Sequence, residues 1–119
     1  MKVNLHDVPR QYSPMDGITI HDMGDVTLNP DEQLTFRTES GKCNDVARKE
    51  WGFYLSNSLN WNLRKQGFKT ALVASHASTP PRLYLNLVEV ERMEAFQRYL
   101  TTYNAKVVCW LDDWLEAKG

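Results

Sequence analysis

The sequence predicts an α+β fold, a mostly antiparallel sheet with two helices on one face in the split β-α-β order of ferredoxin-like folds. Several short segments alternate apolar and polar residues, as half-buried strands do. Two further segments repeat apolar residues at helical spacing. The length of 119 residues suits one core, so we expect a single domain with an irregular N-terminal arm over 1–30 and the core over 31–119.

The first 30 residues are rich in residues that interrupt regular structure, namely Pro9, Pro14, Gly17, Gly24 and Pro30. Only residues 18–20 alternate like a strand, so we expect an arm with one short strand. The pairs His6-Asp7 and His21-Asp22 offer side chains that transition metals bind. Adjacent side chains on an extended chain point to opposite faces and no third ligand is placed, so exposed turn residues are the favoured interpretation and no metal site is predicted.

The core is expected to begin with a hairpin. Residues 33–38 alternate as an edge strand, residues 39–42 form a turn, and the chain returns through Val46. Large apolar residues then alternate over 51–55, which predicts another strand.

A short helix is predicted next, over 57–66. Ser56 can cap its start, Leu59 and Leu63 share one of its faces, and Gly67 is a natural left-handed stop. Residues 69–74 are a compact apolar run, which favours a strand. A strand-helix-strand crossover normally makes its two strands parallel and is right-handed, so we expect that arrangement here.

The remaining segments complete the pattern. Alternating leucines over 83–88 predict a strand, and residues 106–111 predict the last one. Between them, residues 91–103 carry the apolar stripe of an amphipathic helix, formed by Met93, Phe96, Leu100 and Tyr103. Residues 112–117 are expected to form a terminal helical turn.

Charge is uneven along the chain, although the formal net charge is only −1. Residues 1–34 carry a net −4, residues 35–69 a net +4 and residues 70–119 a net −1. The basic middle segment could attract a phosphate or carboxylate, whereas the whole chain lacks the positive balance of a nucleic-acid binder. No apolar run approaches the ~20 residues of a membrane span, so we expect a cytoplasmic protein whose two cysteines are reduced thiols.

Known catalytic and cofactor motifs are absent. The chain has no GxSxG elbow and neither of the common nucleotide fingerprints, so no cofactor is predicted. His76 and the carboxylates Asp112 and Asp113 are the nearest candidates for acid or base chemistry. A solvated loop histidine and a solvated helix start are the favoured interpretations of these residues, so a non-catalytic binding or accessory role is favoured over an enzyme.

Asn57, Asn60 and Arg64 are three and four residues apart and are expected to share one helical face. Amides and a guanidinium recognise hydroxyls and phosphates through directional hydrogen bonds, which predicts a site for an anionic or hydroxyl-rich ligand such as a sugar phosphate. An exposed polar helix face is the alternative. The predicted ligand-binding residues are Lys49, Tyr54, Asn57, Asn60, Trp61 and Arg64.

The C-terminal segment is unusually apolar. Trp110 is expected to pack within its own chain because it belongs to the last strand. Trp114 and Leu115 lie beyond the core pattern, so we expect them to contact a second copy or a partner protein, with packing on the same chain as the alternative.

The segments KEWGFY (49–54), SLN (58–60), GFKTALV (67–73) and VVCWLD (107–112) resemble a small family of bacterial proteins. That family is associated with gene clusters for surface polysaccharide and sugar-nucleotide synthesis, and the resemblance covers roughly the last two thirds of the chain. It implies a bacterial cytoplasmic protein that works near sugar metabolism. Together with the residues above, we expect a small binding or accessory protein that recognises a sugar phosphate, a nucleotide sugar or a partner enzyme in surface-polysaccharide synthesis. A small enzyme acting on a nucleotide sugar and an RNA-binding module are the alternatives.

Overall fold

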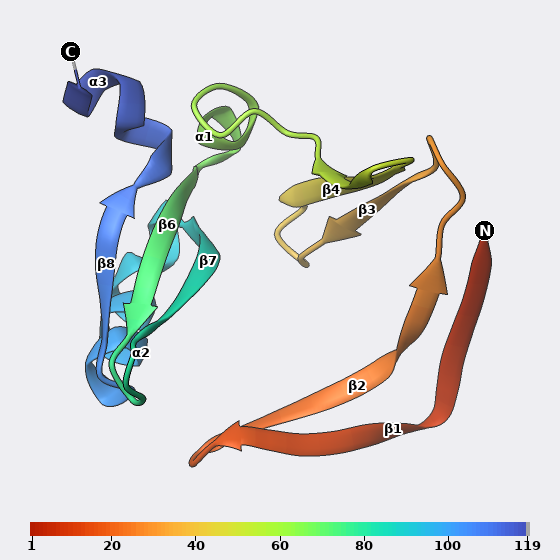
Figure 1. The fold of residues 1–119 in the computed structure, drawn as a ribbon, viewed down its shortest axis with the longest axis horizontal. Helices are drawn as coiled ribbons and strands as arrows, with labels where there is room; N and C mark the ends of the chain where they lie inside the picture. The colour runs from red at the N-terminus through yellow and green to blue at the C-terminus, as the bar shows by residue number, and fades with distance from the viewer. Residues whose placement is uncertain (119) are drawn as a thin grey trace. The chain divides into compact units, whose positions relative to one another are not determined.

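The structure is a computed structural model that describes residues 1–118, and it is a mixed α+β fold (Figure 1). All strand pairs in the described chain are antiparallel, as the sequence predicted for most of them. The chain divides into two compact units, Met1–Ser56 and Asn57–Gly119, which we call the N-terminal and C-terminal units. The single-domain organisation expected from the length stays a prediction.

The first 30 residues form a long hairpin, so the expected irregular arm is wrong. β1 (Lys2–Met15) pairs with β2 (Ile18–Thr27). Its register is irregular between Leu5 and Arg10 and between Tyr12 and Met15. Pro9 and Pro14 lie in these two irregular stretches, where a missing amide proton breaks no regular ladder bond.

One face of this hairpin carries apolar pairs on both sides of the Arg10–Asp22 ion pair. Cross-strand partners lie on the same face of an antiparallel pair, and the pairs Val3–Val26 and Tyr12–Ile20 are both apolar. These side chains are between 38% and 54% exposed, because no further layer of the N-terminal unit covers them. Leu28 is the one buried hydrophobic residue of this unit.

A three-stranded sheet completes the N-terminal unit, in the order β3-β4-β5. Its strands are β3 (Gln33–Arg37), β4 (Cys43–Lys49) and β5 (Gly52–Leu55), which confirms the hairpin and the strand predicted over 51–55. The crossover predicted from that strand is wrong, because β5 pairs with β4 across a two-residue turn. Closing so short a turn costs little chain entropy, and this favours the local antiparallel partner.

The C-terminal unit holds a second three-stranded sheet, with β6 (Phe68–Ser75) at its centre between β7 (Arg82–Glu89) and β8 (Ala105–Trp110). All three strands were predicted. A ferredoxin-like order would need residues 51–55 as a fourth strand of this sheet, but they form β5 of the other sheet. The ferredoxin-like order is therefore not confirmed.

The helix predicted over 57–66 is much shorter. α1 (Asn62–Gln66) has Trp61 at its N-cap position, and the amide of Asn62 donates to Ser58 Oγ at 2.8 Å. The predicted cap at Ser56 is wrong, since the Ser56 hydroxyl donates instead to Gln33 within the N-terminal unit. Gly67 ends α1 with φ 94°, the left-handed conformation that the sequence predicted.

The remaining helices follow the predicted order. A 3₁₀ turn, η1 (Val90–Arg92), leads into α2 (Met93–Thr102), and another, η2 (Leu111–Asp113), leads into α3 (Trp114–Lys118). None of the helices in the described chain combines the length and apolar character needed to cross a bilayer.

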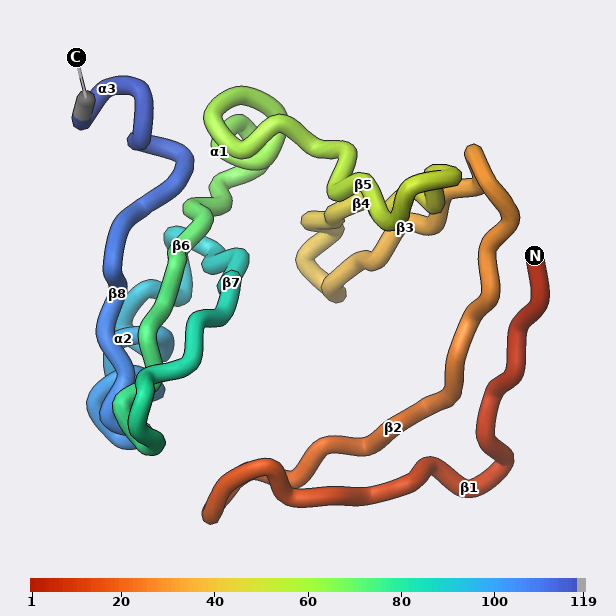
Figure 2. Tube along the Cα trace, in the orientation of Figure 1, coloured from red at the N-terminus to blue at the C-terminus, as the bar shows by residue number. Residues whose placement is uncertain are grey.

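The core of the C-terminal unit lies between α2 and one face of the sheet (Figure 2). Ala71 and Val73 of β6 meet Leu100 of α2, and all three are buried. Phe96 packs edge-on against Trp110 with ring centres 6.1 Å apart, which confirms the prediction that Trp110 packs within its own chain. A second helix on the same face is not confirmed.

Candidate functional site

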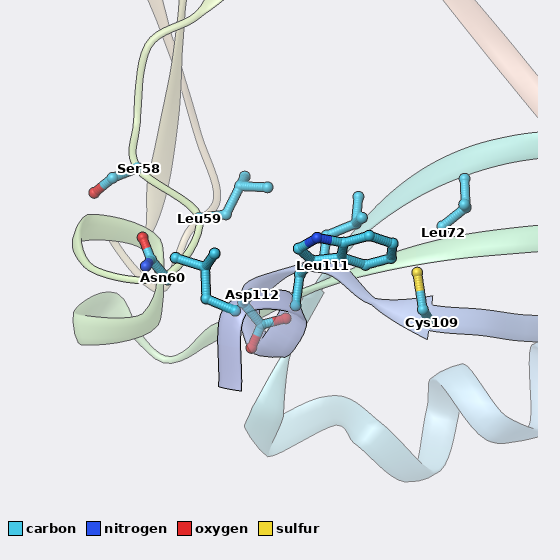
Figure 3. A pocket seen from close by; sticks show the side chains of 9 residues that line it. Ser58, Leu59, Asn60, Leu72, Cys109, Leu111 and Asp112 are labelled. Carbon is cyan, nitrogen blue, oxygen red and sulfur yellow. The ribbon is translucent and has the colours of Figure 1, made fainter. Parts of the chain in front are cut away.

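The C-terminal unit contains a pocket of about 540 Å³ beside α3 (Figure 3). This volume falls within the ~300–1,000 Å³ of typical small-molecule sites. The lining residues come from the segment before α1, from β6 and β8, and from η2 and α3. They are Ser58, Leu59, Asn60, Leu72, Cys109, Leu111, Asp112, Trp114 and Leu115.

The pocket combines apolar walls with a small polar rim. Leu72 and Cys109 are cross-strand partners on β6 and β8, on the sheet face opposite α2. Ser58 and Asn60 lie at the other end of the lining, and the Ser58 hydroxyl points away from the apolar side chains and accepts from the Asn62 amide (Figure 3). An apolar body with a few placed polar groups is the usual character of a small-molecule site.

A charged network anchors η2 and α3 beside the pocket, and Asp112 is its centre. The Asp112 carboxylate is fully buried and accepts hydrogen bonds from the Thr70 amide at 2.9 Å and from Lys69 Nζ at 3.0 Å. Burial alone would raise the pKa of Asp112, but these hydrogen bonds outweigh it and hold the pKa below its usual value. Asp112 is therefore ionised and structural at neutral pH.

Arg64 is the second cation of this charged network. It donates to the backbone oxygen of Asp112 at 2.6 Å, to the Asp113 carboxylate at 2.9 Å and to Glu116 at 3.0 Å. The hydrogen bond to Glu116, together with the nearby carboxylates, raises the pKa of Arg64.

Lys69 also contacts Asp113, at 2.9 Å. Burial alone would lower the pKa of Lys69. Its hydrogen bonds to Asp113 and Asp112 outweigh burial, so the pKa of Lys69 lies above its usual value. Three carboxylates thus surround two cations, and the cluster repels further anions more than it attracts them.

The residues predicted to bind a ligand have different local surroundings. Asn60 lines the pocket, whereas the Asn57 amide donates to Asn62. Trp61 is 69% exposed and lies under the Lys65 ammonium, 5.2 Å from its ring centre.

The predicted shared helical face is wrong, because Asn57 and Asn60 precede α1 and Arg64 turns to the charged network. Lys49 and Tyr54 belong to the N-terminal unit, on β4 and β5, and Lys49 pairs with Asp31. A joint ligand-binding role of these residues stays a prediction.

Trp114 and Leu115 both line the pocket and remain 46% and 72% exposed. Their predicted contact with a second chain stays a prediction. Leu72 and Cys109 also line the pocket, and neither was predicted as a site residue. Alternation along residues 69–74 could have placed Leu72 on the face away from Ala71 and Val73, but the pairing that brings Cys109 beside it is long-range.

The histidines that the sequence singled out make contacts within their own units. The backbone amide of His76 donates to Asn104, next to the loop that joins β6 and β7. His6 lies 4.0 Å from Asp22 across the hairpin. Up to residue 118, no three His, Cys, Asp or Glu side chains are grouped to hold a metal ion.

No protein-family model matches the chain, and neither the curated proteins nor the solved structures contain a significant match.

Proposed function

We propose that this chain is a non-catalytic binding protein whose pocket takes the sugar moiety of a hydroxyl-rich ligand such as a nucleotide sugar. The observation that carries the proposal is the distribution of polar groups in the pocket. Apolar side chains form its walls, and Ser58 and Asn60 stand together on one side. A sugar ring has the matching character, with apolar C–H faces and a hydroxyl edge.

Hydroxyls suit this pocket better than phosphates. The two nearby cations, Arg64 and Lys69, already contact Asp112, Asp113 and Glu116. A phosphate would have to displace one of these carboxylates. We therefore place the sugar in the pocket and any phosphate groups of the ligand outside it.

A binding role is favoured over catalysis because the acidic group nearest the pocket is committed to structure. Asp112 holds the Thr70 amide and Lys69, and its lowered pKa removes it as a proton donor near neutral pH. The resemblance to bacterial proteins of polysaccharide gene clusters supports a sugar ligand in a bacterial cytoplasmic setting.

Thermal denaturation with a panel of free sugars, sugar phosphates and nucleotide sugars tests the proposal. A ligand at a hundred times its dissociation constant should stabilise the chain by about 2.7 kcal/mol. Asn60→Ala and Trp114→Ala should lose the shift in Tm. Trp61→Ala is the matched control, because Trp61 lies outside the pocket. This variant should keep the ligand-induced shift in Tm.

No shift with any member of the panel, or a shift that survives both pocket substitutions, would overturn the site. Conversion of a panel member into product, followed by chromatography, would overturn the non-catalytic role.

A further inference from the structure

We propose that β7 pairs edge to edge with β7 of a second copy of this chain, which joins two C-terminal sheets into one six-stranded sheet. In the described chain β7 pairs only with β6, so no strand covers its outer edge, where the Leu85 carbonyl accepts one hydrogen bond from the Asn86 side-chain amide. The eight residues of β7 run in unbroken register with β6, and no charged residue, proline or glycine lies between Leu83 and Val88.

The opposite edge of the same sheet is protected. β8 carries Lys106 and an irregular register at Val108, and both features discourage further strand pairing. In the N-terminal unit, β1 and β2 are interrupted by irregular registers and β3 ends at Arg37. β7 is the longest regular edge in the described chain without such protection.

The side chains of β7 also favour a partner. Leu83, Leu85 and Leu87 alternate along the strand and share one face of the sheet. Leu85 is the cross-strand partner of Leu72, so this face lies opposite the one that α2 covers. Leu83 and Leu85 are 62% and 55% exposed.

The pattern along β7 is complementary to itself. In an antiparallel pair centred on Leu85, that residue meets Leu85 of the second copy, and Leu83 meets Leu87. The same arrangement sets Arg82 opposite Val88 of the second copy, so no like charges face each other across the pair. A two-fold contact of this kind closes on itself, and the outer edges of the joined sheet are the protected β8 strands.

Sedimentation velocity of the full chain over a concentration series tests this inference. The wild type should form a reversible dimer. Leu85→Lys and Leu85→Glu should each be monomeric, because like charges then meet at the centre of the pair. An equimolar mixture of the two variants should recover the dimer, because the central pair is then oppositely charged. Far-ultraviolet circular dichroism should show that both variants keep their fold, since Leu85 is already half exposed.

Leu115→Lys is the matched control, because Leu115 is an exposed leucine on α3 rather than on β7. It should leave the dimer unchanged. A wild type that is monomeric throughout the series would overturn the inference, as would a dimer that dissociates with Leu115→Lys and persists with Leu85→Lys. Failure of the mixture to recover the dimer would exclude the self-paired strand.

Discussion

The N-terminal hairpin and the C-terminal sheet are built from the same alternation of apolar and polar residues, but they differ in burial. Leu5 in β1 is 67% exposed, whereas Ala71 and Val73 in β6 are 0% and 3% exposed. α2 covers one face of β6, and the hairpin has no comparable layer within its own unit. Alternation thus defines a strand and its faces, while burial depends on a second layer of structure.

Replacing one aromatic residue in each region should give the largest difference in free energy of unfolding. Phe96→Ala should lower the free energy of unfolding by about 3 kcal/mol, because Phe96 packs on the core and against Trp110. Tyr12→Ala in the hairpin is the matched change, and it should cost about 1 kcal/mol or less since Tyr12 is 45% exposed. Urea denaturation measures both, and equal losses would contradict the contrast.

Asp112 and Asp22 give a second matched pair, because each accepts one backbone amide and makes its shortest ion pair at 3.0 Å. Asp112 binds Thr70 and Lys69 with its side chain fully buried, whereas Asp22 binds Gly24 and Arg10 with its side chain 28% exposed. Asp112→Asn should lower the free energy of unfolding by about 2 kcal/mol. Lys69 then loses its buried carboxylate partner, while the Thr70 amide keeps an acceptor.

Asp22→Asn should cost clearly less, because water can replace the lost carboxylate oxygen. Urea unfolding of the two variants beside the wild type measures the difference. A larger loss for Asp22→Asn would show that burial does not set the strength of these contacts.

The stability of the C-terminal unit should also depend on pH through Asp112. Its pKa is lowered in the folded chain, so between the folded value and the unfolded value of about 3.9 the unfolded state binds more protons. The contribution is complete above the unfolded pKa and is lost as the pH falls through the folded pKa. Urea midpoints from pH 6 down to pH 2 should therefore fall less steeply for Asp112→Asn than for the wild type, and parallel curves would contradict the assignment.

The smallest effect is expected at Trp61, although it belongs to the better packed unit. Its ring is 69% exposed and its main contact is the Lys65 ammonium, so Trp61→Ala should cost about 0.5–1 kcal/mol. Unfolding monitored by circular dichroism provides the measurement. A loss of stability as large as that of Phe96→Ala would contradict this expectation. It would mean that the unit in which a side chain lies, rather than its exposure, sets the loss in free energy of unfolding.

Local signals predicted much of the fold. The strands over 33–37, 52–55, 68–75, 82–89 and 105–110 and the helix ending at Thr102 all follow from spacing within a few residues. The end of α1 at Gly67, in the left-handed conformation, was also predicted from the local sequence. The hairpin over 2–27 was missed because Pro9 and Pro14 suggested irregular chain, and their tolerance depends on register shifts that appear only once the strands pair.

The site was harder to predict because its contacts join distant parts of the chain. Arg64 was expected to face a ligand, yet its partners Asp113 and Glu116 lie 49 and 52 residues further on. Asn60 was predicted as a site residue and does line the pocket. The opposite wall depends on the pairing of β6 with β8, which spacing along the sequence does not reveal.

Amide hydrogen exchange of the full chain, resolved by residue, tests the central contrast most directly. Buried strands and helices open only through large unfolding events, whereas exposed hairpins open locally. The amides of Ala71, Val73 and Leu100 should exchange most slowly, and those of β1 and β2 should exchange faster by orders of magnitude. Protection of the hairpin equal to that of β6 would contradict the conclusion that the packed core of the C-terminal unit holds most of the stability.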